Sequence, residues 1–321
     1  MQRQVLITGA TSGIGHEAAA QFANDGFGSI IVTGRTTARA SEAAATLSER
    51  MSHGGFEPLA LDLGDASSIT TAAEALAGRQ LDVVVLNAGL LSPAERQFTD
   101  DGIELTFASS LIGHHRLAMT MLANGGLGPT ARIIIAGSEA ARGDVPMMTF
   151  ANLDRLAEAH HAGDLDAAAV DLIRGVRPTK FKPNDTYATT KLFVAWWAAA
   201  LARRLPDGMT VTAVSPGSTP ATQAGRNANF LTRRVMVPML KRMPKRLDMA
   251  ASVSDAAGRY RQAVDLPIAD ASGAFYASAP RRMSGPIERM TYPHIDRRDH
   301  QEAAWAAIVA VSGLDVAGLR G

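Results

Sequence analysis

Short runs of β-branched and other apolar residues alternate along the chain with longer alanine-rich stretches. The runs are VLIT (5–8), SIIVT (29–33), PLAL (58–61), DVVVL (82–86), RIIIA (132–136) and TVTAV (210–214). Their nearly continuous apolar character predicts strands that are buried on both faces, as in a parallel sheet. The helical patterns between them, such as 17–25 and 67–78, predict crossover helices. Right-handed crossovers then give a doubly wound α/β sheet.

The bulk composition agrees with one large soluble unit spanning residues 1–321. Hydrophobic residues make up 46% of the 321 residues and charged residues 20%, which is enough for a sizeable core. The net charge of +1 gives no reason to expect a nucleic-acid partner. The chain has no cysteine, which excludes disulfides and thiol nucleophiles and suits a reducing compartment. The first apolar run is too short for a signal peptide, so we expect a cytoplasmic protein.

The glycine-rich segment TGATSGIG (8–15) follows the first predicted strand directly and opens a helix. Gly9, Gly13 and Gly15 permit a tight turn, a close approach of the backbone to a pyrophosphate, and close helix–strand packing. The N-terminus of the helix then faces the anion. A glycine-rich turn in this position therefore predicts a dinucleotide site.

The segment YATTK (187–191) opens an apolar helical run. Tyr187 and Lys191 are four residues apart and would lie on the same helix face. A lysine ammonium beside a phenol favours the phenolate and lowers its pKa. The spacing predicts either an acid/base pair or a tyrosine packed on a lysine stem.

Several motifs occur together in the order typical of one family. They are TGATSGIG, LDL (61–63), NAG (87–89), the serine of IIIAGS (133–138), YATTK and SPG (215–217), and they cover roughly residues 4–220. On these motifs the chain resembles the short-chain dehydrogenase/reductase family, which has a Rossmann fold. The segment DGIELTFASSLIGHH (101–115) and the long gap before Tyr187 look most like its retinol dehydrogenase-like and protochlorophyllide reductase-like branch.

The resemblance implies hydride transfer between a nicotinamide and a carbonyl or alcohol. Tyr187 would be the general acid, Lys191 would lower its pKa and bind the nicotinamide ribose, and Ser138 would hydrogen-bond the substrate oxygen. The family's fourth catalytic residue is an asparagine that holds a water, and this chain has Ser110 there. A serine hydroxyl offers fewer donors and acceptors than an amide.

The resemblance also implies a set of cofactor-binding residues along the same edge of the sheet. They are Gly9, Thr11, Ser12, Gly13, Ile14, Gly15, Asp62, Leu63, Asn87, Ala88, Gly89, Tyr187, Lys191, Pro216 and Gly217. Enzymes that prefer NAD usually carry an acid at the end of the second strand, whereas this chain has Arg35 there. Because a guanidinium suits a 2′-phosphate, Arg35 predicts NADP(H) as the cofactor.

The predicted function is therefore reduction of a carbonyl, or oxidation of the matching alcohol, on an apolar small molecule. Two alternatives stay open at this point. One is reduction of an activated C=C bond, in which the same tyrosine would donate the proton. The other is a weakly catalytic NADP-binding scaffold or redox sensor, which the serine at position 110 favours.

Three regions lie outside the family motifs. Residues 145–181 form an insertion with two short capped helices, 152–163 and 164–175, which either roofs the substrate pocket or decorates the surface. The substrate-loop region 218–250 carries a basic apolar stretch that suits a lid; Pro238 and Pro244 disfavour a membrane-surface contact. The C-terminal extension, 289–321, contains a predicted helix over 298–312.

The remaining candidates point to structure. His160, His161 and Asp164 offer no fourth ligand, so no metal site is predicted. His114, which neighbours His115, is expected to be structural, and Trp196 and Trp197 to pack in a core or a subunit contact. The family often pairs subunits through the helices after Asn87 and around Tyr187, which makes a homodimer or homotetramer an expectation.

Overall fold

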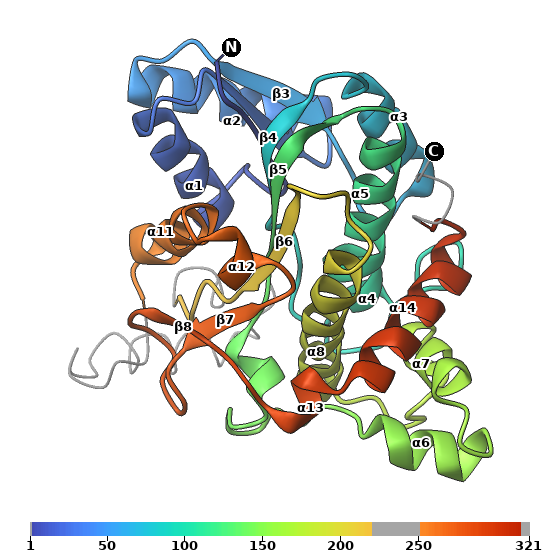
Figure 1. The fold of residues 1–321 in the computed structure, drawn as a ribbon. Helices are drawn as coiled ribbons and strands as arrows, with labels where there is room; N and C mark the ends of the chain where they lie inside the picture. The colour runs from blue at the N-terminus through green and yellow to red at the C-terminus, as the bar shows by residue number, and fades with distance from the viewer. Residues whose placement is uncertain (1, 220–250, 316–321) are drawn as a thin grey trace.

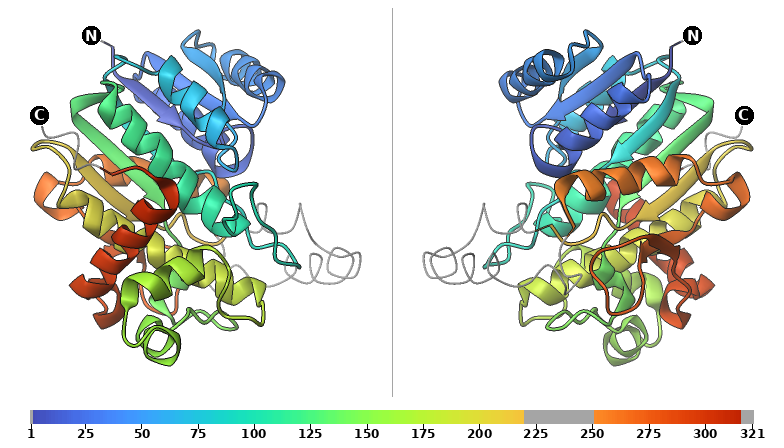
Figure 2. Two further views of the ribbon diagram at one scale, coloured as in Figure 1. Left: turned by 90° about the vertical axis from the view of Figure 1, so that its right-hand side faces the viewer. Right: turned by 90° about the vertical axis from the view of Figure 1, so that its left-hand side faces the viewer.

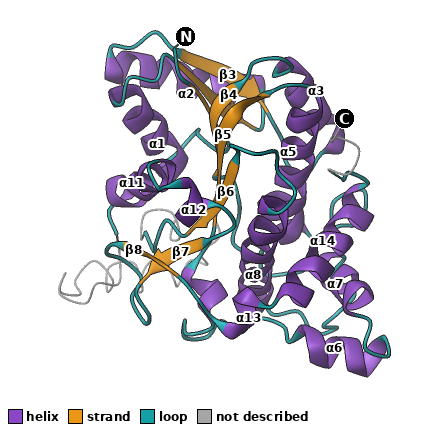
Figure 3. Cartoon of the chain, viewed as in Figure 1, coloured by secondary structure: helices purple, strands orange, loops and turns teal. Residues whose placement is uncertain are grey.

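The computed structural model describes residues 2–219 and 251–315 (Figure 1). Within them an eight-stranded sheet has the order β3-β2-β1-β4-β5-β6-β7-β8. The pairs from β3 to β7 are parallel and only the edge pair β7–β8 is antiparallel. Figure 3 shows the strands in one central layer with helices on both sides. The doubly wound Rossmann-type fold predicted from the sequence is confirmed.

The strands have the following bounds: β1 Gln4–Ile7, β2 Ser29–Gly34, β3 Phe56–Ala60, β4 Leu81–Leu86, β5 Leu127–Ala136, β6 Thr210–Val214, β7 Phe275–Ser278 and β8 Ile287–Arg289. The helices of the first half are α1 Gly13–Asn24, α2 Thr37–Met51, α3 Ala66–Ala75, α4 Leu105–Phe107, the π-helical turn η1 Ala108–Ile112, α5 Gly113–Ala123 and the 3₁₀ turn η2 Glu139–Arg142. The second half holds α6 Leu153–His160, α7 Leu165–Ile173, α8 Pro183–Ala202, α11 Val253–Val264, α12 Ile268–Ala271, α13 Pro293–Asp296 and α14 Arg298–Ser312.

Each face of the sheet buries its own hydrophobic core because alternate strand residues point to opposite faces. In β5, Ile133 and Ile135 join the core under α3, α5, α8 and α14, whereas Ile134 joins the core under α1 and α11. The left view of Figure 2 looks onto the first helical layer and the right view onto the second. Burial on both faces explains why the strand sequences are continuously apolar.

The sequence prediction missed three local features. Strand β5 begins at Leu127, five residues earlier than predicted, and a register shift at Leu81/Val83 accommodates the extra segment. Strand β8 was not predicted, because a three-residue, half-exposed edge strand has almost no apolar signal. The segment 101–115, which was identified by its resemblance to the family, contains the π-helical turn η1, which hydrophobic periodicity does not reveal.

The two helices predicted for the insertion are present with the predicted caps. Asn152 caps α6 by accepting from the backbone of Arg155 at 2.9 Å, and Asp164 caps α7 by accepting from the backbone of Ala167 at 3.0 Å. Helix α7 packs against α14, and its Leu172 and Ile173 belong to the core beneath α8. The helical part of the insertion is therefore integral to the fold. Whether it also narrows access to a substrate stays a prediction.

The C-terminal helix α14 covers the outer side of α8, and its bounds match the prediction. Trp196 and Trp197 are buried there; Trp196 donates to the His294 carbonyl at 2.8 Å and its ring contacts His300. Trp197 donates to Nδ1 of His115 at 3.0 Å. The alternative of core packing is thus confirmed for both tryptophans. Subunit pairing through α8 stays a prediction, and it would require another surface than the one α14 covers.

The basic stretch within 218–250 lies almost wholly outside the described residues. In the parts of the chain that are described, no helix has the length and apolar character needed to cross a bilayer.

Replacing His115 with glutamine tests the buried contact between α5 and α8. Burial lowers the pKa of His115 to about 4, whereas an unfolded histidine titrates near 6.5. Between these values the unfolded chain binds more protons, so stability is lost as the pH falls below about 6.5. We expect His115 to contribute about 2 kcal/mol of this loss between about pH 7.5 and pH 5. Urea unfolding of His115→Gln should therefore show a weaker pH dependence than wild type.

The matched control is His53→Gln, on a partly exposed histidine before β3, which should keep the pH dependence of wild type. Equal pH dependence in wild type and His115→Gln would contradict the prediction.

Candidate active site at the carboxyl edge of the sheet

The glycine-rich turn joins β1 to α1 in the conformation that its sequence requires. Gly9 and Gly13 have φ of +67° and +61°, a region that L side chains rarely adopt. A Cβ on Gly15 would lie 2.5 Å from Nδ2 of Asn87 and 2.6 Å from the Gly9 carbonyl oxygen. The turn is therefore closed tightly against β4. Helix α1 begins at Gly13, so its unpaired amides open at this edge of the sheet, where an anion is stabilised.

The end of β2 lies beside this turn. A Cβ on Gly34 would lie 2.8 Å from Cγ2 of Thr11, which shows how closely the two segments approach. Arg35 follows with an exposed side chain, and no other residue of 2–219 or 251–315 forms an ion pair with it. An exposed guanidinium next to a pyrophosphate-type turn fits a phosphorylated ribose better than a free 2′-hydroxyl.

The segment after β3 is held against α5. Asp62 accepts from the Gly64 amide at 3.0 Å, and the Asp62 amide donates to Oγ of Ser68 at 2.9 Å. Leu63 is buried, and a Cβ on Gly113 would come within 2.4 Å of its carbonyl oxygen. Close packing on α5 therefore places Asp62 and Leu63 at the same edge as the glycine-rich turn.

Asn87 connects three elements at the end of β4. Its Nδ2 donates to the Thr8 carbonyl at 2.9 Å, and its Oδ1 accepts from the Tyr260 hydroxyl of α11 at 3.1 Å. The Ala88 amide donates to Oγ1 of Thr8 at 2.9 Å, and that oxygen also contacts Nε2 of His114 at 3.0 Å. Asn87 therefore has a structural role, and its contact with the cofactor stays a prediction.

His114 is part of the same structural network. It is fully buried, and burial lowers its pKa to about 3, so it is neutral at physiological pH. Its Nδ1 lies 3.3 Å from the Ser110 carbonyl oxygen, one turn earlier. The ring joins the start of α5 to the end of β1.

Ser110 lies within the π-helical turn. Its Oγ is buried and has no hydrogen-bond partner among the described residues. Gly89 separates it from Lys191: a Cβ placed on Gly89 would lie 3.1 Å from Oγ of Ser110 and 3.9 Å from Nζ of Lys191. The unsatisfied hydroxyl thus faces the lysine across a glycine, where a family member would have its asparagine.

Ser138, Tyr187 and Lys191 converge where β5 ends and α8 begins. Lys191 is 5% exposed and its Nζ donates to the Ala136 carbonyl at 2.7 Å. The same Nζ lies 5.7 Å from the centre of the Tyr187 ring. Ser138 follows β5 and caps η2, and its hydroxyl lies near enough to Tyr187 to lower the pKa of the phenol. The structure therefore brings the three predicted catalytic residues together.

The electrostatics differ from the sequence expectation in one respect. Burial raises the pKa of Tyr187, the hydrogen bond with Ser138 opposes that rise, and the Glu139 carboxylate adds to it. Burial lowers the Lys191 pKa to about 8, so Lys191 is mostly uncharged at the higher pH where the phenol itself ionises, and its charge does not offset the rise of the Tyr187 pKa there. The expected lowering of the tyrosine pKa was thus wrong for these two side chains alone.

The SPG turn after β6 closes the site from the other side. Gly217 has φ of +83°, and its amide donates to Oγ of Ser215 at 3.2 Å. Two buried charged residues that the sequence analysis missed lie beneath it, Glu139 and Arg259. The position of Glu139 directly after Ser138 was a usable signal. Arg259 carried none, because it is 42 residues beyond Gly217 on a separate helix.

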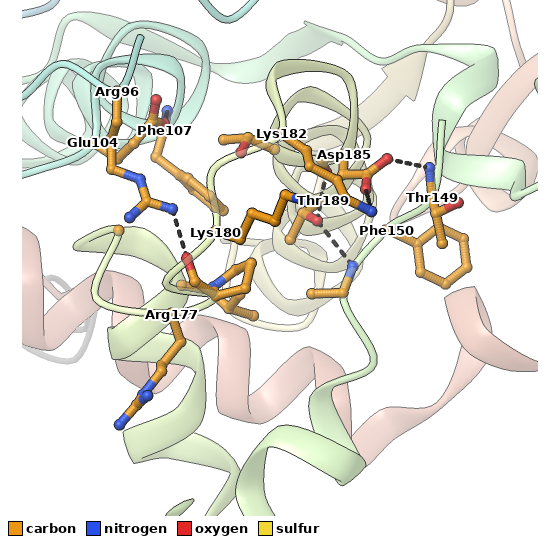
Figure 4. A pocket seen from close by; sticks show the side chains of 15 residues that line it. Arg96, Glu104, Phe107, Thr149, Phe150, Arg177, Lys180, Lys182, Asp185 and Thr189 are labelled. Atoms are coloured by element: carbon orange, nitrogen blue, oxygen red, sulfur yellow. Dashed lines mark hydrogen bonds and ion pairs between the residues drawn. The ribbon is translucent and has the colours of Figure 1, made fainter. Parts of the chain in front are cut away.

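A cavity of about 230 Å³ lies next to the site (Figure 4). Its walls come from the segment before α4, from residues 149–151 and from the junction of the insertion with α8. Hydrogen bonds from Thr149 to Asp185 (3.0 Å) and from Ala151 to Thr189 (2.9 Å) hold these walls to α8. Ser138, Tyr187 and Lys191 do not line this cavity, so it is a neighbouring feature and not the reaction centre.

The histidines of the insertion are engaged separately. Nε2 of His161 bonds Oδ2 of Asp171 at 2.9 Å, and its ring lies edge-on to that of His160 at 6.5 Å between centroids. Among residues 2–219 and 251–315, no three His, Asp or Glu side chains form a group that could hold a metal ion.

Comparison with known proteins agrees with this geometry. Residues 3–150 match the family described as short chain dehydrogenase. The chain is 32% identical over 231 residues to a WW domain-containing oxidoreductase of Danio rerio, covering 71% of this chain and 52% of the relative. It therefore spans only about half the length of that relative.

Two further relatives are matched over most of their length. Retinol dehydrogenase 13 of Homo sapiens is 25% identical over 325 residues, covering 99% of this chain and 87% of the relative. Protochlorophyllide reductase of Avena sativa is 29% identical over 287 residues, covering 85% and 88%. Both belong to the branch that the sequence motifs indicated.

The fold also matches a solved short chain dehydrogenase of Burkholderia cenocepacia in complex with NADP. The TM-score is 0.58 at 22% identity, with 85% of this chain and 94% of that one covered. The sequence matches, the shared fold and the convergence of Ser138, Tyr187 and Lys191 lead to one conclusion: the chain belongs to the short-chain dehydrogenase/reductase family of oxidoreductases, in the branch that includes retinol dehydrogenases and protochlorophyllide reductases.

Proposed function

We propose that the chain reduces a carbonyl group on an apolar small molecule with NADPH, or oxidises the matching alcohol with NADP. The observation that carries this proposal is the convergence of the Tyr187 phenol, the buried Lys191 ammonium 5.7 Å from its ring centre, and Ser138, whose hydroxyl influences the Tyr187 pKa. A protein that only bound a nucleotide would have no need to bury a lysine next to a phenol and a serine.

The three side chains divide the chemistry between them. When bound, the reduced nicotinamide supplies a hydride to the carbonyl carbon. Ser138 donates a hydrogen bond to the substrate oxygen and stabilises the negative charge that develops there. Tyr187 gives its phenolic proton to that oxygen, which completes the alcohol and leaves a phenolate. The Lys191 ammonium lies 5.7 Å from the centre of the Tyr187 ring, and its positive charge stabilises this phenolate.

The cofactor proposal rests on the glycine-rich turn and on Arg35. The turn offers the α1 N-terminus to a pyrophosphate, and Arg35 offers a bidentate donor to a 2′-phosphate. The related structure from Burkholderia cenocepacia holds NADP on the same fold, which supports this choice. Gly34 precedes Arg35 where an enzyme that prefers NAD would carry an acid.

A weakly catalytic NADP-binding scaffold is the second candidate, and Ser110 is the observation that favours it. Its buried hydroxyl lacks a partner among the described residues, so a proton path from Lys191 would pass a hydroxyl that no described group orients. The third candidate function is reduction of an activated C=C bond. It uses the same tyrosine as proton donor and differs from carbonyl reduction in its product. Product identification with an enone separates it from carbonyl reduction.

Tyr187→Phe tests the central proposal. We expect loss of NADPH oxidation by about 10²–10⁴-fold against a panel of apolar aldehydes, ketones and enones, because the proton donor is gone. Binding of NADPH, followed by its fluorescence, should persist. The matched control is Tyr292→Phe, on a partly exposed tyrosine before α13, which should keep wild-type turnover. Equal turnover in Tyr187→Phe and wild type would sink the mechanism.

Arg35→Ala tests the cofactor preference. Losing a charge-assisted contact to a phosphate should raise the Kd for NADPH by about 10–100-fold and leave the Kd for NADH nearly unaltered. Arg155→Ala, an exposed arginine on α6, is the control for a general loss of positive charge. If the ratio of the two affinities is the same in Arg35→Ala and wild type, Arg35 does not select the cofactor.

Ser110→Asn distinguishes an impaired enzyme from a scaffold. An amide at this position can hold a water toward Lys191, so turnover should rise by up to about tenfold if the proton path is limiting. Ser109→Asn, one residue earlier and partly exposed, is the control. Turnover that stays undetectable in both, with NADPH still bound, would favour the scaffold.

A further inference from the structure

A fully buried ion pair lies directly behind Ser138. Glu139, the next residue, is 2% exposed, and Arg259 of α11 is 3% exposed. Oε1 of Glu139 and Nη1 of Arg259 are 3.2 Å apart. A buried pair of this kind seldom adds net stability over apolar residues of the same volume, because both charges must be desolvated. Its presence next to the candidate catalytic serine therefore calls for a reason other than stability.

The carboxylate of Glu139 ties together the ends of three adjacent strands. Glu139 itself follows β5, and its Oε2 accepts from Oγ of Ser215 at 2.5 Å, at the end of β6. Its Oε1 accepts from Oγ of Ser278 at 3.0 Å, at the end of β7. Because Ser138 and Glu139 are consecutive, anchoring the Glu139 side chain also limits the backbone on which Ser138 is carried.

The guanidinium of Arg259 supports the turn on the opposite side of the site. It donates to the Ser215 carbonyl at 2.9 Å, to Oγ of Ser278 at 2.7 Å and to the Gly285 carbonyl at 2.7 Å. A Cβ on Gly217 would lie 2.9 Å from Nη1 of Arg259, so the guanidinium fills the space under the SPG turn. These contacts therefore join the SPG turn to the end of β7 and to the loop between β7 and β8.

The pair also belongs to the electrostatic surroundings of the tyrosine. The groups around Tyr187 that can carry charge or titrate are Lys191 from α8, Glu139 from η2 and Tyr260 from α11, while Arg259 faces the Glu139 carboxylate and Tyr260. Burial is the largest influence on Tyr187 and raises its pKa, Ser138 opposes the rise, and the Glu139 carboxylate adds to it. The negative charge of Glu139 therefore acts against the phenolate.

We propose that the Glu139–Arg259 pair is a positioning unit that holds Ser138 and the Ser215–Gly217 turn in register with Tyr187, and that the Glu139 carboxylate opposes ionisation of the phenol. The catalytic meaning of the unit rests on the proposed function of Tyr187. Its effect on the tyrosine does not, because that effect is present in the protein before any turnover.

The test is a spectrophotometric titration of the whole chain without cofactor. Subtracting the phenolate absorbance of a Tyr187→Phe background isolates Tyr187 from the other three tyrosines. In Glu139→Gln, which keeps the shape but loses the charge, Tyr187 should ionise at lower pH and show more phenolate at about pH 10 than wild type. Glu57→Gln, which breaks the half-exposed pair with Arg79 near β3, is the matched control and should titrate as wild type.

A second variant separates charge from position. Arg259→Lys keeps the positive charge but cannot supply all four of the Arg259 contacts. We expect its Tyr187 titration to stay close to wild type while kcat falls by about 10–100-fold, as a displaced serine and turn would cause. This variant also serves if Glu139→Gln does not fold, since it leaves no buried charge unpaired.

The outcomes are distinct. Identical Tyr187 titrations in wild type and Glu139→Gln would overturn the electrostatic half of the proposal, and unaltered kcat in Arg259→Lys would overturn the positioning half. If wild type turns over no substrate, the proposed function fails. The titration then still decides whether Glu139 acts on Tyr187.

Discussion

The hydrogen bond from the Lys191 ammonium to the Ala136 carbonyl is the contact on which the rest of the site depends. It joins the first turns of α8 to the last residue of β5, across 55 positions of sequence. Because the ammonium is buried, it would be strongly destabilising without this acceptor. The bond therefore fixes where α8 begins relative to β5, and with it the distance between Tyr187 and Ser138. The burial of the tryptophans of α8 beneath α13 and α14 holds the same helix from the outer side.

A second set of contacts holds the end of β4, which lies between β1 and β5 in the sheet. The Asn87 side chain donates to the Thr8 carbonyl, and the Ala88 amide donates to the Thr8 hydroxyl. His114 bonds this hydroxyl from α5, and Tyr260 bonds Asn87 from α11. These groups bond one another and so hold the ends of β1 and β4 together. Ser110 is the exception within this set, because its buried hydroxyl has no described partner. This unpaired hydroxyl lies beside Gly89, which also adjoins Nζ of Lys191.

Glu139 and Arg259 hold the ends of β6 and β7 by hydrogen bonds in a similar way. A parallel sheet brings the carboxyl ends of its strands to one edge, but it does not by itself fix the loops that leave them. A buried carboxylate with three donors and a guanidinium with four acceptors constrain those loops more than apolar packing would, since hydrogen bonds are directional. The cost is a negative charge near the tyrosine, which raises the Tyr187 pKa.

Much of this could be predicted because it depends on local chemistry. The apolar pattern was sufficient to predict the parallel strands. The caps Asn152 and Asp164 were sufficient to predict the insertion helices, and the glycine pattern to predict the turn between β1 and α1. The order of the motifs was sufficient to identify the family and to select Ser138, Tyr187 and Lys191 as the candidate catalytic residues. Each of these signals is carried by residues close together in sequence, or by a pattern whose members need no partner to be recognised.

What the tertiary structure alone decided involves pairs of residues that are distant in sequence. The π-helical turn at Ser110, the antiparallel strand β8, the covering of α8 by α14 and the Glu139–Arg259 pair all depend on which segments meet. The sign of the pKa shift at Tyr187 belongs here too. The i, i+4 spacing determined that a lysine would lie beside the phenol, whereas burial of both groups, which only packing determines, decided which protonation state the protein favours.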